Sequence, residues 1–255
     1  MKNSLFLILI LNIHIIFAQK SVKIEYEQKM LYSESFFNQV PELHREGLKK
    51  IALKPEKLVL SCNEDYSLFK NENLKEETVK GKGLIAPKTI DAGLVFKPYK
   101  NWVLKDYSQK TATVIKTVAD KEFYIKKPFE KGEFIFSGKE KVIEGFNCKL
   151  AYLIKGQNDT IQYWYTQDIP VIDGPETNIS LPGLVLSIES KKKLVYATKI
   201  EFFDKPLDLD KIDKNIPFVT IEEYEKQRLE ALKPKSFIDA TGNKQESHSV
   251  TIKRD

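Results

Sequence analysis

The side chains best suited to nucleophilic or metal chemistry are scarce in this sequence. Its 255 residues include only 3 His and 2 Cys. His14 lies in an apolar N-terminal run and His248 in a polar C-terminal segment, so His44 is the one histidine expected within the folded region. A serine or cysteine nucleophile needs a nearby base, and zinc enzymes mostly use histidine ligands. The sequence therefore predicts no histidine-assisted nucleophile, no zinc enzyme and no cofactor.

Carboxylates are the remaining candidates for chemistry. Asp168, Asp173 and Glu176 fall in one short segment, and carboxylate oxygens are the ligands that Ca²⁺ prefers. Pro170 and Gly174 lie in the same segment, so we favour an ordinary turn over a cation site. Paired acids can also hydrolyse glycosides without histidine. A hydrolase that uses acidic residues alone therefore stays open as an alternative.

Cys62 and Cys148 are the only thiols, and they allow two interpretations. An even pair in an oxidising compartment favours a disulfide between them. The alternative is two separate buried thiols that behave as small apolar side chains. The sequence does not supply the distance that decides between them.

The charge pattern argues against a nucleic-acid-binding protein. The 41 basic residues exceed the 36 acidic residues by only five, and arginine occurs only at positions 45, 228 and 254. Lysine and acidic residues alternate along the chain, which is typical of a solvated surface. We therefore expect no nucleic-acid partner.

The N-terminus has the features of a secretory signal peptide. Lys2 precedes an apolar run from residue 5 to Ala18, and a membrane anchor would need about 20 apolar residues. We expect residues 1–18 to be removed, which places the protein in the periplasm or outside the cell with no transmembrane segment after cleavage. A single β-rich domain is expected over residues 19–232, and a flexible polar tail over 233–255.

Alternating apolar and polar residues predict an antiparallel sheet. Thr220 and Glu223 form a capping box that predicts a C-terminal helix, and a second helix over 36–50 is weakened by Pro41. The fold class is therefore mainly β (β-rich α+β): a curved antiparallel sheet or half-barrel with a C-terminal helix packed on it. The strands are expected at 21–32, 57–62, 66–70, 102–107, 112–118, 122–125, 133–136, 147–155, 160–166, 184–189 and 194–203.

The sequence between residues 143 and 188 resembles a known family. Ile-Glu-Gly-Phe-Asn-Cys at 143–148 is followed by Tyr-Trp-Tyr-Thr-Gln-Asp-Ile-Pro at 163–170, Asp-Gly-Pro at 173–175 and Leu-Pro-Gly-Leu-Val-Leu at 181–186. This order is similar to that of the GLPGLI family of secreted bacterial proteins. Ser180 replaces the first Gly of the family's motif, and Val185 replaces its final Ile. The resemblance is dense over 142–203 and looser over 20–230, and it implies a location in the bacterial cell envelope and no established activity.

The motif itself has a structural and a ligand-binding interpretation. Pro182 and Gly183 suit the central positions of a type II turn, in which Gly183 would hold a positive φ. That turn would fix the register of the next strand, and it is the interpretation we favour. The density of Trp, Tyr, Pro and Gly also favours a ligand site, because loops carried by a sheet often bind ligands. The candidate binding residues are Trp164, Tyr165, Pro170, Pro182, Gly183 and Leu184.

Taken together, these features favour a non-enzymatic envelope protein with a binding or accessory role. By analogy of fold, a curved sheet could hold an apolar ligand or a peptide, and another envelope protein is a further candidate partner. Besides the acid-only hydrolase, a surface or adhesion component is an alternative. An apolar cavity would favour the binding protein, two facing carboxylates the hydrolase, and a flat exposed aromatic patch the adhesion component.

Overall fold

The computed structural model describes most of the chain beyond the predicted signal peptide. The described residues are 21–38, 42–72, 77–85, 88–96, 100–118, 121–155, 159–210, 212–213, 215–231, 235–238 and 244–247. Residues 1–18 and the predicted cleavage after Ala18 lie outside them.

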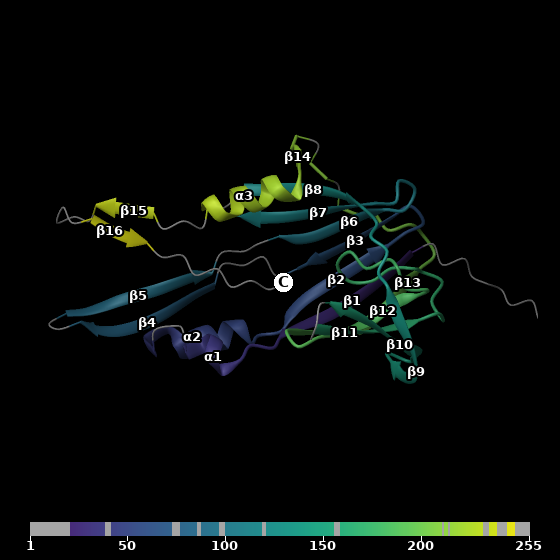
Figure 1. Ribbon diagram of the computed structural model, residues 1–255, viewed down its shortest axis with the longest axis horizontal. Coiled ribbons are helices and arrows are strands. Elements are labelled where there is room, and N and C mark those ends of the chain that lie inside the picture. Colours follow the sequence, from purple (N-terminus) through teal and green to yellow (C-terminus); the bar gives the residue numbers. More distant parts are fainter. Residues whose placement is uncertain are drawn as a thin grey trace, which may run out of the picture.

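Within the described ranges, twelve strands form one large open sheet, which confirms the predicted fold class (Figure 1). All neighbouring pairs are antiparallel except β14 and β8, which are parallel. Across the sheet, the strands lie in the order β14 (Phe218–Val219), β8 (Lys121–Pro128), β7 (Thr111–Val118), β6 (Asn101–Asp106), β3 (Tyr66–Asn71), β2 (Glu56–Cys62), β1 (Ser21–Met30), β13 (Lys193–Phe203), β12 (Leu184–Glu189), β11 (Asp159–Thr166), β10 (Phe146–Lys155) and β9 (Phe134–Ile143).

Strand β1 joins the two halves of this sheet. It pairs with β2 on one side and with β13 on the other, so the first strand of the described residues lies near the centre. Its alternating residues Val22, Ile24 and Tyr26 are buried in a single core cluster that includes residues of both halves. The two halves of the sheet curl toward each other in Figure 1, and the core cluster includes residues of both. Apolar alternation therefore determines which face of each strand is turned inward.

Three helices accompany the sheet in the described part of the chain. The segment predicted as one helix contains α1 (Glu34–Asn38) and α2 (Glu42–Ala52), and residues 39–41, which include Pro41, lie outside the described residues. Helix α3 (Ile221–Ala231) lies on the sheet, where the Tyr224 ring packs edge-on against Phe123 with 5.6 Å between centroids. No helix among the described residues is long and apolar enough to span a membrane.

The predicted capping box of α3 is confirmed. The Thr220 amide donates to the Glu223 carboxylate at 2.8 Å, and the Glu223 amide donates to the Thr220 hydroxyl at 3.1 Å. We expect Thr220→Ala to lower the free energy of unfolding by about 1 kcal/mol, because a helix amide loses its acceptor. Thermal unfolding measures this loss. Glu222→Ala, in the same helical turn but outside the box, is the control, and an equal loss for both variants would contradict the prediction.

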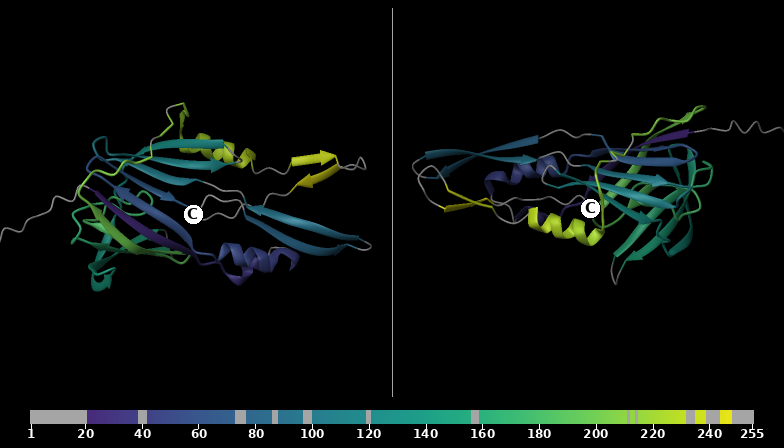
Figure 2. Two further views of the ribbon diagram at one scale, coloured as in Figure 1. Left: turned by 180° about the vertical axis from the view of Figure 1, so that it is seen from behind. Right: turned by 90° about the horizontal axis from the view of Figure 1, so that it is seen from above.

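Two hairpins extend away from the large sheet, which the sequence patterns did not predict (Figure 2). Strands β4 (Glu77–Ile85) and β5 (Lys88–Phe96) form one, and β15 (Lys235–Ile238) and β16 (Lys244–Ser247) form the other. The second hairpin belongs to the segment 233–255, predicted as a flexible tail, so the described part of that segment is paired strand. Both hairpins leave the sheet at the end where α1 and α2 lie.

Candidate functional site

A row of side chains crosses the inner face of the sheet in strict register. Val22 on β1 pairs with Cys62 on β2, Cys62 with Ser67 on β3, and Ser67 with Lys105 on β6. Directly paired residues point to the same side of an antiparallel sheet. The register therefore brings a thiol, a hydroxyl and an amine to one face, where apolar side chains surround them.

Asp173 meets this row from the loop between β11 and β12. Its carboxylate oxygen Oδ1 accepts hydrogen bonds from Lys105 Nζ and, at 2.6 Å, from the Gly174 amide. The other oxygen, Oδ2, accepts from the Ser67 hydroxyl and from the Tyr107 hydroxyl, the latter at 2.5 Å. Cys62 Sγ lies 3.9 Å from the same oxygen. We call Cys62, Ser67, Lys105, Tyr107 and Asp173 the Asp173 cluster.

The amine of Lys105 is also fully used. Besides Asp173, Nζ donates to the carbonyl oxygens of Gly174 at 2.7 Å and Asn178 at 3.4 Å. The side chains of Lys105 and Asp173 are both 0% exposed. Lysine and aspartate are almost never fully buried unless they are paired. The cluster therefore anchors the 173–178 segment of the loop to β6.

Burial sets the protonation of the neighbouring groups. Desolvation raises the pKa of the Cys62 thiol well above its usual value, and the Asp173 carboxylate adds to the rise. Desolvation is also the main cause that raises the pKa of the Tyr107 hydroxyl, and the negative charge of Asp173 is the second cause. Both groups are therefore neutral hydrogen-bond donors at physiological pH, and neither serves as a nucleophilic anion.

Two proline-centred turns shape the loop that carries Asp173. The Val171 amide donates to the Ile169 carbonyl at 2.8 Å, and the Gly183 amide donates to the Leu181 carbonyl at 2.9 Å. Each bond spans three residues, which is the pattern of a γ-turn. The predicted type II turn at Pro182 is therefore wrong, and Gly183 does not hold a positive φ.

Gly183 is required for another reason. A Cβ atom at this position would lie 2.1 Å from the Thr166 carbonyl oxygen. A Cβ at Gly174 would lie 2.7 Å from Cβ of Val185. Both glycines thus allow the loop to lie directly against β11 and β12.

An apolar pocket of about 510 Å³ lies beside the Asp173 cluster, at the ends of β1, β2, β6 and β13. Cys62 and Tyr107 belong to both the cluster and the pocket wall. Ile172 is 57% exposed and Phe202 37% exposed, so the wall presents apolar surface to solvent. We call it the strand-end pocket, and its lining residues are Ser21, Val22, Cys62, Asn63, Glu64, Tyr107, Lys110, Phe129, Ile169, Pro170, Val171, Ile172, Ile179 and Phe202.

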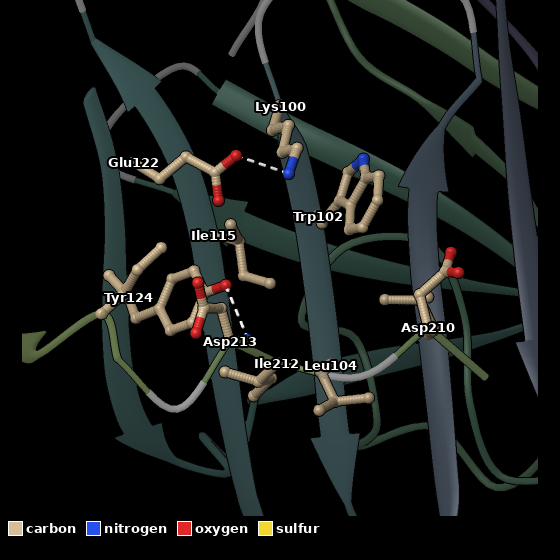
Figure 3. Close-up of a pocket in the computed structure, with 11 residues that line it drawn as sticks. Lys100, Trp102, Leu104, Ile115, Glu122, Tyr124, Asp210, Ile212 and Asp213 are labelled. Atoms are coloured by element: carbon tan, nitrogen blue, oxygen red, sulfur yellow. Dashed lines mark hydrogen bonds and ion pairs between the residues drawn. The ribbon is translucent and has the colours of Figure 1, made fainter. Parts of the chain in front are cut away.

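A second cavity of about 290 Å³ lies between the 210–216 segment and β3, β6, β7 and β8 (Figure 3). Three carboxylates line it, and each has a partner of its own. Glu122 binds Lys100 at 2.5 Å and Asp210 binds Lys70 at 2.6 Å. Asp213 accepts from the Asn215 amide at 2.9 Å. Two of the three carboxylates are therefore paired with lysines, and the third is bonded within its own segment.

Of the six residues predicted for binding, the pairing of β11 with β12 brings Trp164, Tyr165, Gly183 and Leu184 close together, but not around a pocket. Trp164, Tyr165 and Leu184 are buried in the core, and Gly183 lies against the β11 backbone. Pro182 is exposed. Pro170 is the one member of the set that lines the strand-end pocket.

Both cysteines are free and buried, so the structure has the second of the two arrangements left open by the sequence. Cys62 faces Asp173, whereas Cys148 Sγ lies 3.6 Å from the Phe146 carbonyl oxygen. Burial raises the pKa of Cys148 to about 11.

The three acids of the 168–176 segment also separate. Asp173 enters the buried cluster, Asp168 accepts from the Asn147 amide at 3.0 Å, and Glu176 pairs with Lys193. No group of three His, Cys, Asp or Glu side chains suited to a metal occurs among the described residues. Sequence reasoning missed Lys105, Tyr107 and Ser67. Trp102, Val103 and Leu104 put apolar residues on both sides of β6, so alternation did not mark Lys105 as inward-facing.

A comparison with family models matches a segment that holds three of the five cluster residues. A family model described as "Protein of unknown function (Porph_ging)" matches residues 100–187. That segment includes Lys105, Tyr107 and Asp173, together with eight of the strand-end pocket's lining residues. No curated protein matches the sequence.

Solved structures resemble the fold over most of the chain. The structure of PNGF-II in the P21 space group aligns with a TM-score of 0.57 and 17% identity, and that in the C2 space group with 0.54 and 15%. Each alignment covers 86% of this chain but 35% of the other. The chain thus spans about a third of the length of these proteins, and at this identity the likeness shows the fold alone.

Proposed function

We propose that this protein is a non-enzymatic binding or accessory protein whose strand-end pocket takes an apolar ligand or an apolar side chain of a partner. The observation that carries the proposal is the pocket itself. Its walls are mostly aliphatic and aromatic, and its volume of about 510 Å³ falls in the range of small-molecule sites. Exposed apolar surface of this kind on a charged protein marks a binding surface.

The position of the pocket favours insertion of a ligand over addition of a peptide strand. It lies at the ends of β1, β2, β6 and β13, and each of these strands has a neighbour on both sides. A peptide that adds to a sheet needs an unpaired edge. The edge strand β9 shifts register against β10 between Lys149 and Ala151, and such irregular edges disfavour pairing.

The chemistry beside the pocket supports binding over catalysis. One acid, the exposed Glu64, lines the pocket itself. The carboxylate behind the pocket wall, Asp173, is saturated by Lys105, Ser67, Tyr107 and the Gly174 amide. It has no position left from which to take a proton from a substrate. The cluster therefore supports the pocket wall and does not react with what enters.

We further propose that the protein is exported to the periplasm or the cell surface and is a GLPGLI-type envelope protein. The N-terminal apolar run ending at Ala18 supports export, and the motif order over 142–203 supports the family. Residues 142–187 of that motif region fall within the matched family segment of unknown function.

Ile172→Glu tests the pocket. We expect it to weaken binding of the neutral apolar probe N-phenylnaphthylamine at least tenfold, about 1.4 kcal/mol, because a carboxylate would intrude on the apolar wall. Fluorescence titration of the purified full chain measures the dissociation constant.

Ile154→Glu is the matched control. Ile154 is 58% exposed, close to the 57% of Ile172, but it lies on β10 outside the pocket. The control should bind the probe as the unmodified protein does. Equal binding by both variants, or no saturable binding by the unmodified chain, would contradict the proposed site.

A further inference from the structure

Lys105 and Asp173 form the most completely buried pair of opposite charges in the described part of the chain. Both side chains are 0% exposed, and Nζ contacts Oδ1 directly. Every other ion pair of the described residues has at least one partner more than 10% exposed. Removing two charges from water costs several kcal/mol per ion, and mutual attraction does not always recover it. A reaction that removes both charges would be favoured here.

The surroundings fix the two groups against each other. Nζ is held by the carbonyl oxygens of Gly174 and Asn178 on its far side, so its movement is restricted. Lys105 Nζ contacts Oδ1, and Oδ1 is bonded directly to Cγ of Asp173. Cγ is the carbon that an amine would attack, so the nitrogen lies close to it. Oriented contact of this kind raises the effective concentration of a nucleophile by many orders of magnitude.

We propose that Lys105 and Asp173 condense to form an amide between their side chains, an isopeptide bond. A proton first passes from the Lys105 ammonium to the Asp173 carboxylate, which gives a neutral amine and a neutral acid. Nζ then adds to Cγ, the new C–N bond forms, and the C–Oδ2 bond breaks. The leaving oxygen takes one proton from the acid and one from the amine and departs as water, so the step needs no oxidant, reductant or other co-reactant.

Two hydroxyl groups are placed to assist the departure of Oδ2. Ser67 and Tyr107 both donate hydrogen bonds to this oxygen, and they stabilise the negative charge that develops on it. Burial keeps Tyr107 protonated, so it remains a donor throughout the reaction. The Gly174 amide donates to Oδ1, which becomes the oxygen of the product amide.

The bond would join parts of the sheet that the chain connects only distantly. Lys105 and Asp173 are 68 residues apart, on β6 in one half and in the loop before β12 in the other half. The inference does not rest on the proposed ligand site. It concerns the wall behind the pocket and holds whether or not a ligand binds.

Intact-mass spectrometry of the denatured, purified chain tests the bond. The mass is compared with that calculated from the N-terminus determined on the same sample. We expect the folded protein to be lighter by one water molecule, and a protease digest to contain one branched peptide that joins the segments holding Lys105 and Asp173.

Two variants provide controls. Lys105→Met has no amine and should show its full calculated mass, while Asp173→Asn should be lighter by one ammonia molecule, since the amide nitrogen then leaves. The measurement on the unmodified chain decides the question even if a variant fails to fold. A full calculated mass for the unmodified protein, or a branched peptide at other residues, would overturn the proposal.

Discussion

Gly183→Ala is expected to lower the free energy of unfolding by about 3 kcal/mol, the upper part of the range for overpacked sites. The added Cβ would lie 2.1 Å from the Thr166 carbonyl oxygen and 2.8 Å from its carbon. These are backbone atoms at the end of β11, so they cannot rotate away as the tip of a side chain could. The loop that carries Asp173 would have to move off the sheet. Urea unfolding monitored by circular dichroism measures the loss.

Gly138→Ala is the matched control for this substitution. Gly138 lies on β9, its φ is not in the left-handed region, and a Cβ there would meet no atom within 4 Å. The change should alter stability by less than about 0.5 kcal/mol. A loss at Gly183 as small as that at Gly138 would show that the close approach to Thr166 is not needed.

Patterns of a few neighbouring residues predicted those helices and strands whose formation depends on neighbouring residues. The alternation of β1 set its buried face, and Thr220 with Glu223 marked the start of α3 because a capping box spans only four residues. Strands β4 and β5 were missed, since Gly81, Gly83 and Gly93 interrupt their apolar pattern.

Gly183 shows where local reasoning ends. Sequence identified the residue as structurally important but attributed this to its own φ angle. The actual constraint is the Thr166 carbonyl, which belongs to another strand and is unknown until β11 and β12 are paired. A Pro-Gly dipeptide is compatible with several turns, so its conformation depends on the packing around it.

The Asp173 cluster could not be found from spacing for the same reason. Its members come from β2, β3, β6, the turn after β6 and a distant loop. The sheet register brings Cys62, Ser67 and Lys105 together, and the loop adds Asp173. Asp173 was noticed with Asp168 and Glu176 as one of three nearby acids, yet each of the three has a different partner. Their closeness in sequence thus suggested one shared site, whereas the fold places the three acids in different surroundings.

Asp173 is expected to make a large contribution to the free energy of unfolding, because four groups donate hydrogen bonds to its carboxylate. Asp173→Ala would leave the Lys105 ammonium buried with neither a counter-charge nor the amide bond proposed above. In the chain before condensation, it would also remove the acceptor of Ser67, Tyr107 and the Gly174 amide. Breaking a buried pair costs about 3–5 kcal/mol, and each buried donor left unsatisfied adds to this. We expect a loss of about 4 kcal/mol or more, a large part of the 5–15 kcal/mol typical of a folded protein.

A double-mutant cycle separates the charge pair from simple loss of packing. Lys105→Met removes the ammonium and keeps much of the side-chain volume, so Lys105→Met with Asp173→Leu leaves no buried charge. In urea unfolding, the double variant should lose at least 2 kcal/mol less of the free energy of unfolding than the two single variants lose in sum. Residues in direct contact couple by about that much. Additive losses would show that Lys105 and Asp173 stabilise the sheet independently, and that the loop is held by Ser67, Tyr107 and the close contacts of Gly174 and Gly183 instead.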